Sequence, residues 1–136
     1  MRAAPRRRAA KVLCDIVSSL PQGRIDAETT ANYPILSTGT TARNVICDQA
    51  HIAGEARSRD PKKLADYIER FKTTCQDIAQ RHGAGVELKI VEEYPAFLVE
   101  EDHPLLTMAK QVCGRLAIPF TVIAGGGAMD ANIYTG

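Results

Sequence analysis

Residues 50–83 read AHIAGEARSRDPKKLADYIERFKTTCQDIAQRHG, and they decide the fold because a strand, a helix start and a helix stop follow one another. The first part alternates small apolar residues with polar ones, which predicts the second half of a long strand over Asn44–Ser58. Asp60 and Pro61 then suit the N-cap and the first position of a helix. Its buried stripe consists of Leu64, Tyr67, Ile68, Phe71, Cys75 and Ile78. Gly83 suits a left-handed cap at the end of this helix.

The residues before this stretch predict another helix and another strand. One continuous apolar face runs up to a stop at Pro21-Gln22-Gly23, and it consists of Ala9, Val12, Leu13, Ile16, Val17 and Leu20. Thr29–Leu36 alternates as a strand does. The side chains expected to share one face of it are Ala31, Tyr33 and Ile35. Pro34 has no N–H to donate, which favours an edge strand or a bulge.

The residues after residue 83 predict two more strands and a third helix. Val86–Val91 alternates as a strand, and Phe120–Ala124 is a short apolar strand that leads into three glycines. Between them, His103-Pro104 begins a helix whose inward residues are Leu105, Leu106, Ala109, Val112, Cys113 and Leu116. Residues 1–98 therefore read α-β-β-α-β, and residues 99–136 read as a helix, a strand and a glycine-rich turn.

This order predicts an α+β chain in two parts. Residues 1–98 are one strand short of the ferredoxin-like β-α-β-β-α-β motif, the missing strand being the first. Residues 99–136 read as a fragment of a three-layer α/β domain, too small to bury its own strand. We therefore expect a domain boundary near residue 98.

Composition excludes several classes of protein. The 136 residues carry a net charge of +1, which provides no global attraction for nucleic acid, and no apolar run reaches the about 18 residues of a membrane span. The four cysteines form no C-x-x-C pair, so we expect reduced thiols and a cytoplasmic protein. The basic start suits a structural helix, a mitochondrial transit peptide, or an RNA-binding arm that uses Arg2, Arg6, Arg7, Arg8 and Lys11.

Three places carry polar groups that could bind a ligand. Asn44 can offer a donor and an acceptor to a peptide, or it can cap a turn. Arg57 can hold a carboxylate with its planar guanidinium, or it can pair with Glu55 or Asp60 on a solvated strand. The glycines at 125–127 can bring backbone N–H groups close to an anion, or they can form a plain tight turn. The three histidines are isolated from one another in the sequence, so we expect no self-sufficient zinc site.

Five segments in this order resemble the peptidase T-like branch of the zinc-dependent aminopeptidase/carboxypeptidase family. This family also contains carboxypeptidase G and the diaminopimelate desuccinylase. The segments are P-x-G-R-I-D-x-E-T-T-A-N (Pro21–Asn32), T-x-R-N-V-I-C-D (Thr41–Asp48), E-A-R-S (Glu55–Ser58), Y-P-A-F (Tyr94–Phe97) and G-G-A-M-D-A-N-I (Gly126–Ile133).

The resemblance implies a parent with a dinuclear zinc domain and an inserted lid that mediates homodimerisation. Residues 1–98 resemble the lid without its first strand, and residues 99–136 resemble the return into the catalytic domain. The substrate-binding Asn and Arg of the family fall on Asn44 and Arg57. The glycine-rich substrate loop falls on residues that include Gly126, Gly127 and Ala128, where Ala128 replaces a third glycine of the family.

The resemblance places the metal ligands and the transition-state His of the family outside these residues. We therefore expect part of a zinc tripeptidase that acts on short peptides, with no catalytic residue and no zinc in this chain alone. The alternative is a free-standing ferredoxin-like module that dimerises or binds a small carboxylate without catalysis. Neither nucleic acid nor a membrane is an expected partner.

Overall fold

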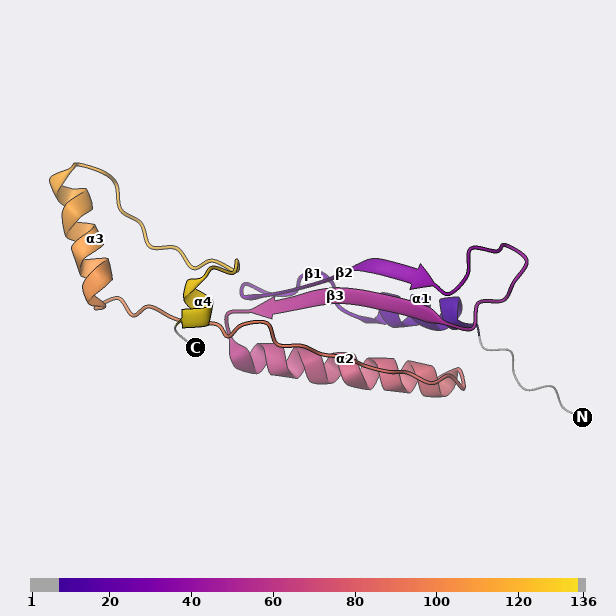
Figure 1. The fold of residues 1–136 in the computed structure, drawn as a ribbon. Coiled ribbons are helices and arrows are strands. Elements are labelled where there is room, and N and C mark those ends of the chain that lie inside the picture. The colour runs from indigo at the N-terminus through magenta and orange to yellow at the C-terminus, as the bar shows by residue number, and fades with distance from the viewer. Residues whose placement is uncertain (1–7, 135–136) are drawn as a thin grey trace, which may run out of the picture. The chain divides into compact units, whose positions relative to one another are not determined.

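The computed structural model describes residues 8–134, which form two compact units that divide between Glu92 and Glu93. The first unit contains α1 (Ala9–Ser19), β1 (Gly23–Arg24), β2 (Thr29–Thr38), β3 (Ala50–Ser58) and α2 (Pro61–Arg81) (Figure 1). The second unit contains α3 (Pro104–Arg115) and α4 (Ala131–Tyr134). The assignment of residues 1–98 to a lid and 99–136 to a catalytic remnant stays a prediction. Residues 2, 6 and 7 of the proposed RNA-binding arm lie outside the described part.

The first unit is a mixed α/β fold, as the sequence predicts. Its sheet has the order β1-β2-β3 with antiparallel neighbours. Helices α1 and α2 lie along the same face of this sheet (Figure 1). The core between helices and sheet consists of Val12, Ile16, Leu20, Tyr33, Cys75 and Ile78. Among residues 8–92 no helix lies on the opposite face of β2 and β3.

The two helices begin and end where the sequence predicts. The carboxylate of Asp60 caps α2 by accepting the backbone N–H groups of Lys62 and Lys63, at 2.8 and 3.3 Å. Gly83 follows the end of this helix with a φ of +62°, a conformation that glycine adopts without strain. At the far end of α2, His82 Nε2 lies 2.7 Å from the carboxylate of Asp15 on α1. This contact ties the two helices together next to their apolar stripes.

A β-bulge in β2 corrects one prediction of the sequence. Asn32 lies opposite Glu55 and Ile35 lies opposite Ala53, so Tyr33 and Pro34 together face the single residue Gly54. The extra residue reverses the alternation that follows it. Ile35 therefore leaves the core face, on which the sequence placed it, and its side chain is 56% exposed. Pro34 sits in the bulge, one of the two places that its missing N–H predicts.

Two buried tyrosine hydroxyls form a short polar chain inside this core. Tyr67 donates to the carbonyl oxygen of Pro21 at 2.8 Å, and its oxygen lies 2.7 Å from that of Tyr33. A hydroxyl has one proton, so Tyr33 must donate to Tyr67. Desolvation raises the pKa of both phenols, and the bond that Tyr33 donates raises its own further. Both hydroxyls are thus neutral and hydrogen-bonded in the core.

Three predicted strands are shorter than expected or absent. Asn44–Gln49 belongs to a loop because β2 ends at Thr38, which pairs with Ala50, and leaves those residues without a neighbouring strand. Val86–Val91 and Phe120–Ala124 are not strands in the described residues. Alternation of apolar and polar residues favours a strand, but a strand also needs a neighbouring strand to which it is hydrogen-bonded. The chain after α2 instead runs back along this helix and packs Ala84 and Leu88 against the core (Figure 1).

The second unit confirms the third helix but not its buried face. Helix α3 starts at Pro104, and the imidazole Nδ1 of His103 accepts the N–H of Leu105 at 3.2 Å. None of the α3 residues is buried within the described residues, and Leu105 is 66% exposed. The side chains predicted to face inward therefore form an apolar surface on this unit.

Candidate functional site

Arg57 lies near the end of β3 on the face of the sheet that carries no helix. The register places Thr30 opposite Arg57 and Asn32 opposite Glu55, so four polar side chains form a small array on two adjacent strands. A hollow of about 390 Å³ opens here, and it is lined by Gly23, Thr30, Ala31, Asn32, Glu55 and Arg57. This is enough space for a carboxylate and part of a short peptide beside the guanidinium.

The guanidinium of Arg57 forms an ion pair with its neighbour on the same strand face. Its Nε donates to Glu55 Oε1, and the two side chains are 43% and 49% exposed. The structure thus contains the pairing that the solvated-strand interpretation predicts. A pair at this exposure contributes little to stability. Both side chains of the pair line the hollow.

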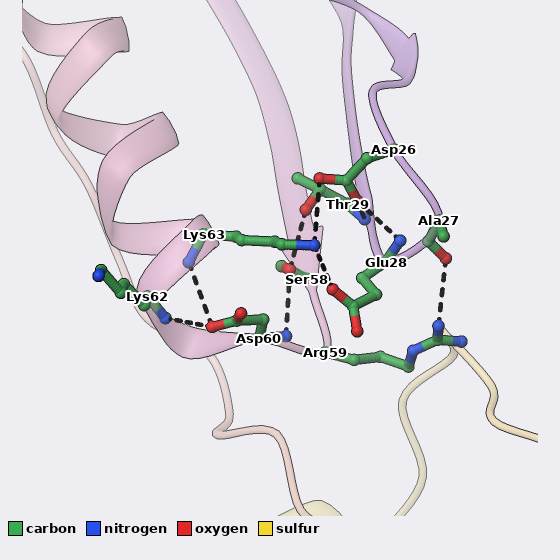
Figure 2. A network of polar contacts seen from close by, with 9 residues as sticks. All are labelled: Asp26, Ala27, Glu28, Thr29, Ser58, Arg59, Asp60, Lys62 and Lys63. Carbon is green, nitrogen blue, oxygen red and sulfur yellow. Dashed lines mark hydrogen bonds and ion pairs between the residues drawn. The ribbon is translucent and has the colours of Figure 1, made fainter.

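The end of the sheet next to Arg57 is fixed by a polar network (Figure 2). The carboxylate of Asp26 accepts the backbone N–H groups of Glu28 and Thr29 at 2.7 and 2.8 Å, which shapes the turn before β2. Thr29 in turn contacts the hydroxyl of Ser58, the last residue of β3, at 3.0 Å. The contact between Thr29 and Ser58 therefore fixes the register of β2 and β3 one residue away from Thr30 and Arg57.

Charged groups complete this network. Lys63 of α2 pairs with Glu28 and lies 3.6 Å from Asp26, and Arg59 donates to the carbonyl of Ala27 at 3.2 Å (Figure 2). The backbone N–H of Glu28 lowers the pKa of Asp26, and the bond to Glu28 raises the pKa of Lys63. The sequence alone predicts no role for these residues. The signal for this turn would have been Asp26 itself, because an Asp side chain often accepts the backbone N–H groups two and three residues later.

Asn44 lies far from Arg57 within one protomer. It is exposed in the loop between β2 and β3, before β3 begins at Ala50, whereas Arg57 is the penultimate residue of that strand. Residues 50 and 57 alone are separated by about 23 Å at the rise of an extended strand. An extended tripeptide spans about 10 Å. One short peptide cannot contact both residues of the same protomer.

The glycine-rich loop belongs to the second unit. Gly126, Gly127 and Ala128 are exposed, and a Cβ built on either glycine would meet no described atom within 4 Å. Neither glycine has a positive φ. Nothing in the described unit requires a glycine at these positions, so the loop has open space in which to approach another group.

Asn132 closes this loop; it lies in the Gly126–Ile133 segment, but the sequence alone predicts no role for it. Its side chain is buried, with 7% exposure. The amide oxygen accepts the N–H of Met129 at 3.0 Å, and the amide nitrogen donates to the carbonyl of Pro95 at 2.9 Å. The end of the glycine loop is thereby tied to the Y-P-A-F segment, 37 residues earlier. Two of the segments that carried the family resemblance are in contact.

The described residues offer no metal site of their own. Among residues 8–134, no three His, Cys, Asp or Glu side chains lie close enough together to hold a metal ion. The zinc that the resemblance implies for the parent therefore does not fit a site made by this part of the chain. No helix within the same residues has both the length and the apolar character to cross a membrane.

Comparison with known families gives a match over most of the first unit. Residues 2–83 match the family model of the M20 peptidase dimerisation domain. The uncharacterized protein YqjE of Bacillus subtilis (strain 168) is 33% identical over 128 residues, which are 94% of this chain and 34% of that protein.

Two solved structures share the fold. Aminopeptidase PepT from Bacillus cereus ATCC 10987 has a TM-score of 0.84 and 27% sequence identity. A tripeptidase from Staphylococcus aureus subsp. aureus Mu50 has a TM-score of 0.88 and 24% identity, a likeness of fold alone. Each match covers 93% of this chain and 34% of the other. The chain thus spans about one third of the length of the relatives that it matches.

Proposed function

The chain belongs to the M20 peptidase dimerisation domain family, and from this premise we propose that it is part of a zinc-dependent, peptidase T-like aminopeptidase that hydrolyses short peptides. The observation that carries the proposal is the match to PepT, which extends over 93% of the chain and both of its units. The dimerisation-domain match alone would support only a dimerising module.

In this proposal Arg57 holds a carboxylate of the peptide. Its support is the hollow on the open face of the sheet and the array of polar groups around it. Glu55 keeps the guanidinium over this hollow, and the network at Asp26 and Thr29 fixes the strand ends beneath it. An arginine in this position gives affinity for peptides with a free carboxyl group.

Asn44 and the glycine loop take the other substrate contacts. Because Asn44 and Arg57 of one protomer lie too far apart for one short peptide, we propose that each contacts a different peptide, which a homodimer with two sites allows. Gly126, Gly127 and Ala128 are exposed, which suits a loop whose backbone N–H groups approach a substrate. Hydrolysis would need the zinc domain of the parent, whose metal would supply an activated water. We therefore expect this chain alone to bind peptides without cleaving them.

The proposal places the protein in the cytoplasm as a homodimer. Its four cysteines are all free, which suits a reducing compartment. The printed description of its family as a dimerisation domain supports the homodimer.

The experiment is a calorimetric titration of the chain with a tripeptide and with the same tripeptide as its C-terminal amide. The amide removes the carboxylate and nothing else. We expect the acid to bind at least about tenfold more tightly, and Arg57→Gln to abolish the difference. Arg81→Gln, on the surface of α2, is the matched control and should bind like the parent chain. Equal binding of acid and amide would overturn the role of Arg57, and chelator-sensitive cleavage by this chain would overturn its dependence on a separate zinc domain.

A further inference from the structure

The hollow beside Arg57 contains charges of both signs. We call this space the Arg57 hollow, and it is lined by Gly23, Thr30, Ala31, Asn32, Glu55 and Arg57. Among these described residues Glu55 is the one acid and Arg57 the one base. Their side chains form an ion pair in which both partners remain partly exposed. A ligand that enters the Arg57 hollow therefore meets a carboxylate as well as a guanidinium.

The uncharged side chains of the Arg57 hollow favour an anion beside the guanidinium. Thr30 lies opposite Arg57 in the register, and Asn32 lies opposite Glu55. The amide oxygen of Asn32 accepts the backbone N–H of Tyr33 at 3.0 Å, so its amide nitrogen is the group that can donate to a ligand. The hydroxyl of Thr30 can donate as well. The hollow thus holds three donor groups suited to a carboxylate, and Glu55 is the exception.

We propose that Glu55 determines the substrate class of this site, which is peptides whose C-terminal residue is basic. The inference rests on the proposed peptide site at Arg57 and deepens it. When a peptide carboxylate binds Arg57, two carboxylates lie beside one guanidinium, because Glu55 already contacts it. A cationic side chain on the last residue of the peptide restores the balance by pairing with Glu55. An acidic side chain would instead add a third negative charge.

The spacing of the two charged residues on β3 fits this arrangement. Glu55 and Arg57 are two residues apart on one face of an extended strand, so their Cα atoms are separated by about 7 Å. The carboxyl group and the side chain of the last peptide residue branch from the same Cα atom. The four-carbon stem of a lysine is long enough to reach Glu55 from a carboxylate that is bound to Arg57.

Arg24 is the charged residue that could oppose this preference. It lies opposite Thr30 on β1, on the other side of β2 from Arg57, and it is not among the residues that line the hollow. Two strand spacings separate the backbones of Arg24 and Arg57 by about 10 Å, a distance at which physiological salt largely screens exposed charges. Glu55 contacts the guanidinium directly, so its charge dominates beside a carboxylate bound there.

Calorimetric titration of the chain with Ala-Ala-Lys and with Ala-Ala-Glu tests this inference. The two peptides share a free carboxyl group and differ in the charge of the last side chain. An exposed charge contact changes affinity by about threefold, so attraction and repulsion together should make the Lys peptide bind about tenfold more tightly. Glu55→Gln should reduce this ratio to less than about threefold. Glu55→Lys should reverse the order, which a merely structural role of Glu55 would not do.

Glu69→Gln is the matched control, because Glu69 is the exposed partner of another ion pair, with Lys72 on α2. It should keep the tenfold ratio, and circular dichroism checks that all variants fold. Suppose that the parent chain prefers a peptide acid to its amide. Equal binding of the Lys and Glu peptides, tighter binding of the Glu peptide, or a ratio that persists in Glu55→Gln would then overturn the role of Glu55 while the peptide site stands. Equal binding of acid and amide would overturn the peptide site, and this inference with it.

Discussion

Removing the hydroxyl of Tyr67 should destabilise the protein more than removing that of Tyr33, although the two oxygens share a hydrogen bond. In Tyr67→Phe the carbonyl of Pro21 loses its donor, and the Tyr33 hydroxyl loses its acceptor. Two lost bonds at about 1 kcal/mol each give a loss of about 2 kcal/mol. In Tyr33→Phe the bond from Tyr67 to Pro21 persists, so the loss is about 1 kcal/mol.

The double variant separates this reasoning from a general loss of packing. Once Tyr67 is Phe, the bond between the two hydroxyls is already lost, so replacing Tyr33 with Phe removes no further hydrogen bond. The double variant should therefore lose about 2 kcal/mol, not the about 3 kcal/mol that additive effects would give. Urea unfolding followed by circular dichroism at constant protein concentration measures all four species. Additive losses, or a larger loss for Tyr33→Phe, would refute the direction assigned to the two bonds.

Three further predictions concern a glycine in the sheet, the cap of α2 and the turn before β2. Gly54→Ala should lower the free energy of unfolding in urea by about 3 kcal/mol or more, because the new Cβ would clash with the backbone oxygen of Asn32. Gly85→Ala is the control: its Cβ meets open space, and it should change this free energy by less than about 0.5 kcal/mol. Asp60→Ala should lower the free energy of unfolding by about 1 kcal/mol, because α2 loses its N-cap. Asp60→Asn should retain most of this stability, because an Asn side chain also caps a helix. Thermal melts of both variants distinguish a cap from a charge effect. The pKa of Asp26 is lowered in the folded state, so its carboxylate stabilises the fold at neutral pH. This stabilisation is lost as the pH falls below about 4 and through the folded-state pKa. Asp26→Asn should therefore flatten the acid limb of a plot of melting temperature against pH. An acid limb of unchanged slope would count against that assignment.

The sequence predicts those parts of the fold that depend on neighbours along the chain. The apolar stripe of α1, the Asp60-Pro61 start of α2 and the glycine at position 83 are all local signals, and all three are confirmed. The N-cap, for example, needs only a carboxylate two and three residues before the N–H groups that it accepts. Such interactions do not depend on which strand pairs with which.

Features that depend on distant partners were predicted less well. Ile35 reads as a core residue until the bulge opposite Gly54 shifts the alternation by one, and that bulge requires two strands to be aligned. Val86–Val91 has the pattern of a strand but no hydrogen-bonded neighbour among the described residues. In the sequence Asn132 is an ordinary polar residue. Its buried hydrogen bond to the carbonyl of Pro95 depends on the fold, which brings the two residues together.

The candidate site shows the same division. Residue type and the family resemblance made Arg57 and Asn44 candidate substrate-binding groups, and that role stays a prediction. Because β3 is extended, residues 50 and 57 alone are about 23 Å apart, more than twice the span of a tripeptide, and Asn44 lies before residue 50. A substrate that needs both groups must therefore receive them from two copies of the chain. The homodimer and the peptide site at Arg57 are thus linked hypotheses: a folded monomeric chain should still prefer the peptide acid through Arg57, but it should lack any contribution to affinity that Asn44→Ala removes from the dimer.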